Sequence, residues 1–325
     1  MFVDPDEKSP SVSVAMCTYN GSRFLREQLA SVETQTKLPD ELVVCDDGST
    51  DATADILSDF AGAAPFTVRF IQNKLRLGST RNFEKALTLC RGRFIALADQ
   101  DDIWNPHKLA TLSAFLESNP DAGGVFSDAA LIDVNSDRTG GCLWKTKSFS
   151  PQRDALSPEQ MIDVLLKQNV VTGATMMIRA DSLNRLLPVG ASWIHDGWIA
   201  WMLVLYSRLE FLRTPLTYYR LHDSQQVGAA SSSIAETLAK GRSTGSTHFV
   251  NVAQQFEVLR AHWDALPGSH FARRRLQFDG KIRHMYMRAQ LPHNPLARLP
   301  AILSSSRDYM NYSRGLSSMI RDLVI

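Results

Sequence analysis

The sequence of 325 residues has few cysteines and no pattern that would join them. Cys17, Cys45, Cys90 and Cys142 are widely spaced and form no Cys-x-x-Cys pair. This spacing argues against a zinc site or a disulfide framework as the basis of the fold. Free, scattered thiols are typical of proteins that work in a reducing compartment.

Long hydrophobic runs are also missing. Uncharged stretches such as residues 197–207 reach only about half of the ~20 residues that a membrane span requires. The first ten residues, MFVDPDEKSP, contain no basic segment followed by an apolar one, which argues against a secretory signal. We therefore expect a cytoplasmic protein that is at most peripheral at the inner face of the cell membrane.

Two nucleotide-binding fingerprints are absent, since no GxGxxG follows the first predicted strand and no GxxxxGK[ST] occurs anywhere. No tract is dense enough in Lys and Arg to indicate nucleic-acid binding. The net charge of +1 is unevenly spread, because residues 231–325 carry 13 Lys/Arg against 6 Asp/Glu. This basic C-terminal region predicts attraction to an anionic surface or partner. Its Arg273–Arg275 run fits either a solvated helix face or contact with anionic lipid headgroups.

Strand-like and helix-like segments alternate through the first two thirds of the chain. Short apolar stretches predict strands at residues 11–17, 41–45, 66–71, 93–97, 123–128, 169–179 and 211–219. Helical spacing between most of them predicts an α/β fold with a mostly parallel sheet and helices on both faces. Small polar residues at 229–233 and 241–247 indicate a linker. We expect a catalytic or binding domain over 1–228, and a linker with a helical C-terminal region over 229–325.

Three carboxylates crowd together directly after the predicted strand 93–97, in the stretch ADQDDIWNP. Asp99, Asp101 and Asp102 then lie at a strand's C-terminal end, where open α/β sheets place their ligands. Crowded carboxylates repel one another, and a Mg²⁺ or Mn²⁺ ion carrying a diphosphate would relieve that repulsion. The alternative is a solvated acidic turn that caps the next helix.

Further polar residues fall at the ends of other predicted strands, and so at the same edge of the sheet. Tyr19 follows the first strand, Asp46 and Asp47 end the second, and His222 follows the last. Tyr19 could instead pack on the sheet, one of the two aspartates is expected to cap a helix, and a lone histidine is often structural. Asp196 precedes an apolar helix and could simply cap it.

The ordered set of motifs resembles a known family. The motifs are SVAMCTYNG, VVCDDGSTD, NKLRLGSTRNF, ALADQDDIWNP, VTGATMMIR, HDGW and YRLHDSQQVG, over about residues 11–228. In this order they resemble the inverting family 2 glycosyltransferases, which implies the GT-A nucleotide-diphospho-sugar transferase fold. The DQDDIW and YRLHDSQQVG segments are most similar to bacterial rhamnosyltransferases of surface-polysaccharide assembly.

The resemblance implies a role for individual residues. Asp196 takes the place of the catalytic base, Asp101 is the direct ligand of a divalent metal ion (Mg²⁺ or Mn²⁺), and His222 matches a late histidine that contacts metal or diphosphate. The predicted nucleotide and donor contacts are Thr18, Tyr19, Asp47, Arg81, Asp99 and Arg220, although Arg220 could equally be an ordinary charge. The chain departs from the family where His195 replaces Glu before the base.

The residues themselves suggest which side chains could meet an acceptor. Thr172 and Gly173 would let an acceptor approach the backbone, since glycine has no side chain, or they could form a tight turn. Trp193 and Trp198 flank Asp196 and could supply an apolar floor on which a sugar stacks.

These observations predict a metal-dependent inverting glycosyltransferase. It would move a sugar, with rhamnose from a dTDP donor as the specific expectation, to a hydroxyl of a growing surface glycan or lipid-linked acceptor. One alternative is a non-catalytic nucleotide-sugar-binding scaffold that retains the fold. A nucleotidyltransferase is the other, but it would need a Gly-rich basic loop after the first strand, and residues 18–23 form a poor one.

Overall fold

The computed structural model describes residues 12–223, 234–266 and 272–324. The chain divides into two compact units. The first unit contains residues 1–158, 171–189 and 194–230, and the second contains residues 159–170, 190–193 and 231–325.

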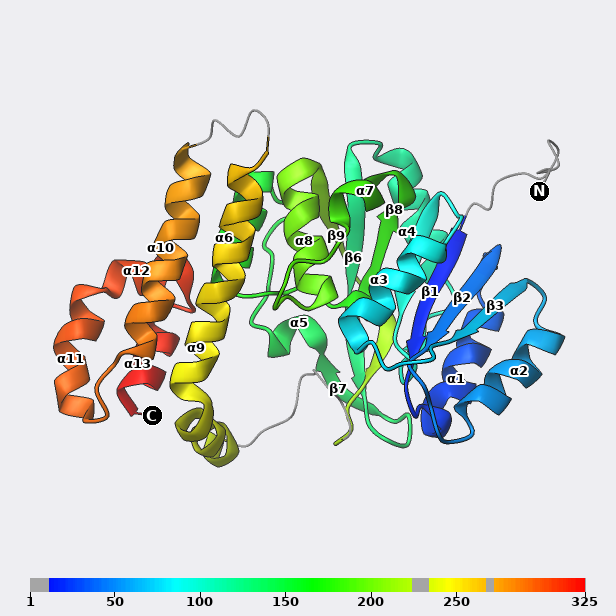
Figure 1. Cartoon of the computed structure of the whole chain (residues 1–325), viewed down its shortest axis with the longest axis horizontal. Helices are drawn as coiled ribbons and strands as arrows, with labels where there is room; N and C mark the ends of the chain where they lie inside the picture. The colour runs from blue at the N-terminus through cyan, green and yellow to red at the C-terminus, as the bar shows by residue number, and fades with distance from the viewer. Residues whose placement is uncertain (1–11, 224–233, 267–271, 325) are drawn as a thin grey trace. The chain divides into compact units, whose positions relative to one another are not determined.

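The first unit is built on a sheet that has nine strands over the described residues (Figure 1). Its order is β3-β2-β1-β4-β8-β6-β9-β5, and β7 pairs with β6 beside this path. The strands are β1 (Val12–Thr18), β2 (Glu41–Asp46), β3 (Thr67–Gln72), β4 (Phe94–Ala98), β5 (Ile103–Trp104), β6 (Ala122–Ile132), β7 (Arg138–Cys142), β8 (Met176–Arg179) and β9 (Arg208–Arg220).

Strand direction changes across this sheet. β3, β2, β1 and β4 are parallel, as the alternation of strands and helices predicts, and β6 is parallel to β9. β8 runs antiparallel to both β4 and β6, and β5 runs antiparallel to β9. The predicted α/β fold class is confirmed, and the sheet is mixed, because the path of the chain between strands sets direction and the strand sequence does not.

Helices cover both faces of the parallel strands. Alternate residues of β1, Val12, Val14 and Met16, enter a core that is shared with α1, α2 and α4. The opposite face is covered by α3, which packs on β1 and β2 and also contacts α8. The helices of this unit are α1 (Ser22–Glu33), α2 (Thr53–Ala63), α3 (Ser79–Leu89), α4 (Lys108–Ser118), α5 (Leu143–Thr146), α7 (Leu183–Leu186) and α8 (His195–Tyr206), with 3₁₀ turns at Gly173–Thr175 and Ala180–Ser182.

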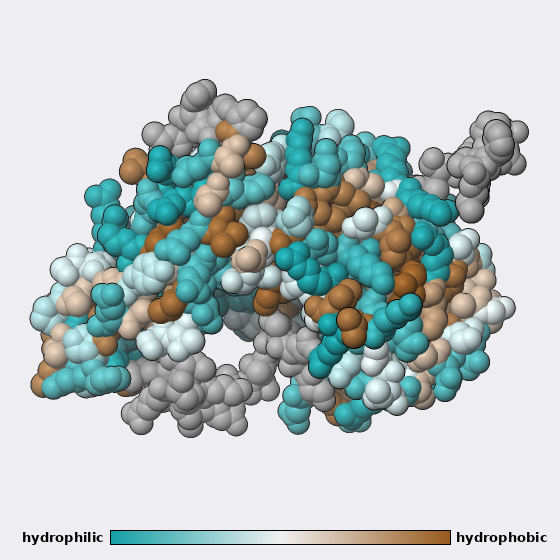
Figure 2. Space-filling model, in the orientation of Figure 1, coloured by the Kyte–Doolittle hydropathy of each residue, from teal (hydrophilic) through white to brown (hydrophobic). Residues whose placement is uncertain are grey.

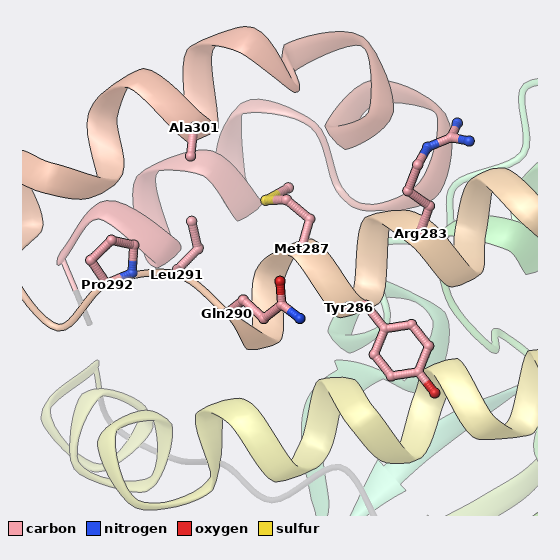
Figure 3. Close-up of a pocket in the computed structure, with 7 residues that line it drawn as sticks. All are labelled: Arg283, Tyr286, Met287, Gln290, Leu291, Pro292 and Ala301. Atoms are coloured by element: carbon pink, nitrogen blue, oxygen red, sulfur yellow. The ribbon is translucent and has the colours of Figure 1, made fainter.

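The second unit is helical. α9 and α10 pack against each other, with Phe256 and Trp263 of α9 both in ring contact with Phe278 of α10. A hollow of about 470 Å³ beside α10 and α11 is lined by residues that include Met287, Leu291 and Ala301 (Figure 3). The helices are α6 (Pro158–Lys167), α9 (Ile234–Asp264), α10 (Ala272–Ala289), α11 (Pro295–Ser304), α12 (Ser306–Tyr312) and α13 (Leu316–Val324).

The surface mixes hydrophilic and hydrophobic residues. Figure 2 shows hydrophobic side chains among hydrophilic ones over α9 and α10. None of the helices in the described part of the chain is long and apolar enough to cross a membrane.

Candidate active site

The acidic cluster lies at the C-terminal end of β4, as the sequence predicts. β4 is fully buried, and Asp99, Gln100, Asp101 and Asp102 follow it directly. The Gln100 side chain accepts a hydrogen bond from the Tyr19 backbone N–H (2.8 Å) and donates to the Tyr19 carbonyl (3.1 Å). This pair of bonds ties the acidic loop to the loop after β1.

Pairing of β5 with β9 explains why Asp101 and His222 meet. Ile103 of β5 lies opposite Tyr218 of β9 in an antiparallel register. The residues that precede Ile103 therefore lie near the residues that follow Tyr218. His222 Nε2 is 2.9 Å from Asp101 Oδ2, and the His222 ring also packs against Phe24. The structure thus brings together the two residues that the sequence predicts as metal ligands.

Burial and mutual repulsion perturb the acids of the cluster. Burial, followed by the charges of Asp101 and Asp196, raises the pKa of Asp99 to about 7 against the opposing charge of Lys108. Burial, followed by the charges of Asp101 and Asp99, also holds the pKa of Asp102 well above its usual range. Asp196 belongs to a different part of the chain, and its charge contributes to the raised pKa of Asp99.

Lys108 is a buried cation beside these acids, and sequence reasoning missed it. Its ammonium donates to the Ala174 carbonyl and to Thr217 Oγ1 (3.0 Å), and lies 3.9 Å from the centre of the Trp104 ring. Burial lowers the pKa of Lys108 to about 7, and the charges of Asp102 and Asp99 oppose that shift. A lysine at the start of a helix carries no local signal for burial under a neighbouring loop.

Asp196 lies in the first turn of α8, against the turn that was predicted to meet an acceptor. A Cβ placed on Gly173 would lie 2.9 Å from His195 Nε2 and 3.7 Å from Asp196 Cβ, so the glycine allows this close approach. His195 is buried and stacks on Phe83 at 4.0 Å between ring centres. Burial lowers the pKa of His195, and the charge of Asp196 opposes that shift. Thr172 and Gly173 therefore lie next to the predicted base.

Lys147 is a second cation that sequence reasoning missed. It follows α5, and its ammonium donates to the Val171 carbonyl (2.8 Å) and to Thr172 Oγ1 (2.7 Å). Burial lowers the pKa of Lys147, while the charge of Asp196 opposes the shift. The lysine thus holds the turn beside Asp196. No pattern in residues 133–157 of the sequence indicates this contact.

Contacts between buried side chains and backbone fix α5, and with it Lys147. Asp128, within β6, accepts hydrogen bonds from the backbone N–H of Trp144 (3.0 Å) and of Ala129 (2.8 Å). The Trp144 ring packs edge-on against Phe149 and Phe211. A short helix that is isolated in sequence is therefore anchored from both sides.

Thr18 and Tyr19, two of the predicted nucleotide contacts, lie at the end of β1. The Thr18 hydroxyl donates to Asp46 (2.8 Å). The guanidinium of Arg76 lies 3.8 Å from the centre of the Tyr19 ring, an arrangement typical of a cation–π contact. Tyr19 is half-buried and its ring is shared with this arginine, which the sequence did not indicate.

The two aspartates that end β2 have different partners. Asp46 accepts from the backbone N–H groups of Gly48 and Ser49 and shapes the turn before α2. Asp47 accepts from the backbone N–H groups of Leu77 (2.6 Å) and Gly78 (2.8 Å). In this structure Asp47 therefore holds the loop before α3, so a contribution to donor binding would act through that loop.

Four other predicted site residues form contacts with other parts of the protein. Arg220 is fully buried, with its guanidinium donating to backbone and side-chain oxygens of the protein. Trp198 is buried and its indole N–H donates to the Leu186 carbonyl (2.9 Å). Arg81 is exposed and pairs with Glu84. Trp193 belongs to the second unit, where its indole N–H donates to the Gln255 carbonyl (2.8 Å).

A divalent cation fits the acidic edge when a diphosphate supplies further ligands. Within the described residues, no group of three or more His, Cys, Asp or Glu side chains is arranged to hold a metal ion. Asp101 and His222 form a pair of suitable ligands, and Mg²⁺ is commonly held by one or two carboxylates together with substrate phosphates. Asp102 Oδ2, next to this pair in the acidic loop, is buried without a hydrogen-bond partner among the described atoms.

The α/β fold, with acidic residues at the carboxyl end of β4, is the arrangement in which such sheets bind their ligands. A family model described as glycosyl transferase family 2 matches residues 13–186, more than half of the chain, and the chain belongs to that family. An uncharacterized glycosyltransferase of Nostoc is 28% identical over 238 residues, which is 71% of either chain. A UDP-Glc:alpha-D-GlcNAc-diphosphoundecaprenol beta-1,3-glucosyltransferase of Escherichia coli is 35% identical over 126 residues, covering 38% of this chain and 48% of that protein.

Solved structures share the fold. The S. aureus TarS fragment in complex with UDP-GlcNAc aligns with a TM-score of 0.58 and 17% identity, covering 96% of this chain and 81% of that one. The mannosyltransferase PcManGT from Pyrobaculum calidifontis, in complex with GDP-Man and Mn²⁺, aligns with a TM-score of 0.51 and 17% identity, covering 94% and 78%. At these identities the likeness concerns the fold alone.

Proposed function

We propose that the first unit is a metal-dependent, inverting glycosyltransferase with Asp196 as its base. One observation carries this assignment: the acidic loop after β4 brings Asp101 Oδ2 to 2.9 Å from His222 Nε2, so two suitable metal ligands meet at the sheet edge. The charge of Asp196, at the start of α8, contributes to the raised pKa of Asp99 in the same loop. This supports one site for the predicted base and the predicted metal-binding acids, which are nearly a hundred positions apart in sequence. The turn at Thr172 and Gly173 lies beside the same aspartate and forms the acceptor side.

Inverting glycosyl transfer requires a base for the acceptor hydroxyl and groups that stabilise the departing nucleoside diphosphate. The acceptor oxygen attacks the anomeric carbon from the face opposite the diphosphate, while the bond to the diphosphate oxygen breaks and its electron pair leaves with the nucleotide. Asp196 accepts the hydroxyl proton of the acceptor. Lys147 holds the turn that presents the acceptor, through Val171 and Thr172.

Asp101 and His222 would hold the cation, with Asp99 nearer to the nucleotide ribose. A bound Mg²⁺ or Mn²⁺ supplies charge stabilisation for the departing diphosphate. PcManGT, which shares the fold, was solved with GDP-Man and Mn²⁺, in keeping with such a cation. Tyr19, joined to the acidic loop through Gln100, would lie against the nucleotide base.

We also propose a donor and an acceptor. Rhamnose carried by dTDP is the donor that the DQDDIW and YRLHDSQQVG segments suggest, and TarS and PcManGT were solved with other nucleotide sugars. A growing glycan on a lipid carrier is the proposed acceptor, and the name of the E. coli relative describes such an acceptor for that protein. We assign catalysis to residues 1–228 and a linker with a helical region to 229–325, working at the cytoplasmic face of the membrane.

Nucleotide binding and transfer test the proposal separately. In thermal unfolding with Mn²⁺ and UDP, dTDP, GDP or CDP, a nucleotide at a hundredfold excess over Kd should stabilise the protein by about 2.7 kcal/mol. Asp101→Ala should lose the metal-dependent part of that shift. Asp196→Asn should keep the shift but lose donor turnover, followed as nucleoside diphosphate release. Turnover by Asp196→Asn at the wild-type rate would refute the base, and binding without turnover by the wild-type protein would favour a scaffold.

A further inference from the structure

α13 presents apolar side chains to solvent and polar side chains to the interior of the second unit. Leu316, Ile320 and Val324 are 68%, 63% and 52% exposed. Ser318 and Asp322 are buried, and at 100° per residue they lie on the opposite side of the helix. A surface helix of a globular protein normally has the reverse arrangement.

The reversed orientation of α13 is fixed by a buried network. Asp322 accepts two hydrogen bonds from Arg288, at 2.6 and 2.8 Å, and one from the Tyr309 hydroxyl at 2.7 Å. The Arg288 and Asp322 side chains are only 4% and 5% exposed. Rotation of α13 to bury its apolar face would expose the Arg288–Asp322 pair and break its hydrogen bonds, so the apolar face stays outward.

α11, which packs against α13, also has an exposed apolar face. Leu296, Leu299 and Leu303 are exposed at the spacing of one helix face, whereas Ile302 is buried. α11 and α13 pack together, and the Arg298 guanidinium donates to the Asp322 carbonyl (2.8 Å). With Met310, these faces hold seven of the thirteen exposed large hydrophobic residues among those that the structure describes. Such a concentration marks an interaction site, because isolated exposed apolar residues are the norm.

The positive charge of residues 272–324 favours an anionic partner. Arg307 of α12, Arg314 between α12 and α13, and Arg321 of α13 are exposed. Residues 272–324 carry ten Lys/Arg against three Asp/Glu. Asp322, one of those three acids, is already neutralised by Arg288. A second copy seated on this face would place like charges against each other, which opposes self-association. Exposed leucines with flanking arginines suit a bilayer surface that contains anionic lipids.

We propose that the outward faces of α11 and α13 dock the protein on an anionic lipid bilayer. The leucine-rich faces enter the boundary between headgroups and acyl chains, and the exposed arginines contact lipid phosphates. The inference deepens the proposed function, since it names the surface by which a transferase with a lipid-linked acceptor reaches its membrane. It concerns partition of the protein, which is measured without any sugar transfer.

Vesicle co-sedimentation of the full chain tests the proposal. Binding should be strong with vesicles of phosphatidylglycerol and phosphatidylcholine, weak with phosphatidylcholine alone, and reduced by added salt. Ile320→Glu should lower the partition coefficient about tenfold or more, since it replaces a membrane-buried side chain by a charge. Arg307→Gln should lower it about fivefold.

Leu276→Glu is the matched control, because Leu276 is also 68% exposed in the same unit but lies near the start of α10. It adds the same charge and should leave partition unchanged. An equal loss in Leu276→Glu, or no loss in Ile320→Glu, would overturn the assigned face. Light scattering that showed a dimer dissociated by Ile320→Glu, without vesicle binding by the wild type, would assign the face to a second copy instead. Nucleotide-induced thermal shifts, measured in parallel, report on the donor site independently.

Discussion

Replacing Arg220 by Met should destabilise the first unit strongly, because the buried Arg220 side chain joins two loops by hydrogen bonds. Its side chain is fully buried between the acidic loop and the loop after β6. Nε donates to the Asp101 carbonyl at 2.7 Å, and Nη1 donates to the Asp133 carbonyl at 3.1 Å and to Ser136 Oγ at 2.9 Å. Nη2 donates to Glu27 at 3.0 Å.

The magnitude follows from the groups that the substitution leaves behind. Met fills much of the volume of the Arg stem but donates no hydrogen bond, so two backbone carbonyls lose a charged donor. Removing one partner of a buried charged network costs about 3–5 kcal/mol. Glu27 is 47% exposed and would be rehydrated, so it adds little to that cost. For a unit of this size, a loss of 3–5 kcal/mol lowers Tm by about 6–20 °C.

Thermal unfolding of Arg220→Met, compared with Arg81→Gln, is the assay. Arg81 is exposed and pairs with Glu84 in the same helix turn, so its substitution should change Tm by no more than about 2 °C. Nucleotide titration on both variants completes the comparison. If Arg220→Met kept its Tm but lost nucleotide affinity, the residue would be a diphosphate clamp and the reasoning from its buried contacts would be refuted.

Two further predictions concern Lys147 and His284. Lys147→Met should lower kcat/KM for the acceptor about 10- to 150-fold, the equivalent of one charged hydrogen bond at 1.5–3 kcal/mol, and leave nucleotide affinity unchanged. Lys145→Met changes an exposed residue of α5, two positions before Lys147, and should have no effect. Equal losses of kcat/KM in both variants would refute the role of Lys147 in holding the acceptor turn. Burial, with the charges of Arg288 and Lys281, lowers the pKa of His284 in the folded protein to about 3. The unfolded chain binds this proton near pH 6.5, so the free energy of unfolding should fall as the pH drops below about 6.5. Urea unfolding should show a loss of about 1.4 kcal/mol per pH unit for this residue, and an equally steep slope in His284→Gln would contradict it.

Local sequence patterns determined the fold class and the placement of the acids. β4 is a short apolar run followed by carboxylates, and the structure has it as a buried strand that ends at Ala98. Asp196 precedes an apolar stretch, and α8 begins beside it at His195. These features are encoded within a few residues, because periodicity and composition report on elements that form from neighbouring parts of the chain.

Tertiary structure alone decided which polar side chains are available at the site. Arg220 looks like a free cation in the sequence, but carbonyl oxygens of distant loops enclose it. Asp47 could have capped a helix, yet it binds backbone N–H groups about thirty residues further on. Lys147 carried no signal, because it reaches Thr172 only after Asp128 and an aromatic cluster have fixed α5.

The physical reason lies in the range of the contacts. The sequence specifies which residues end each strand, and so which edge of the sheet is acidic. The antiparallel register of β5 and β9 then decides that His222 meets Asp101, across 121 positions of the chain. Such pairings depend on strand order and register, which are set by packing of the whole unit and leave no trace in the residues on either side.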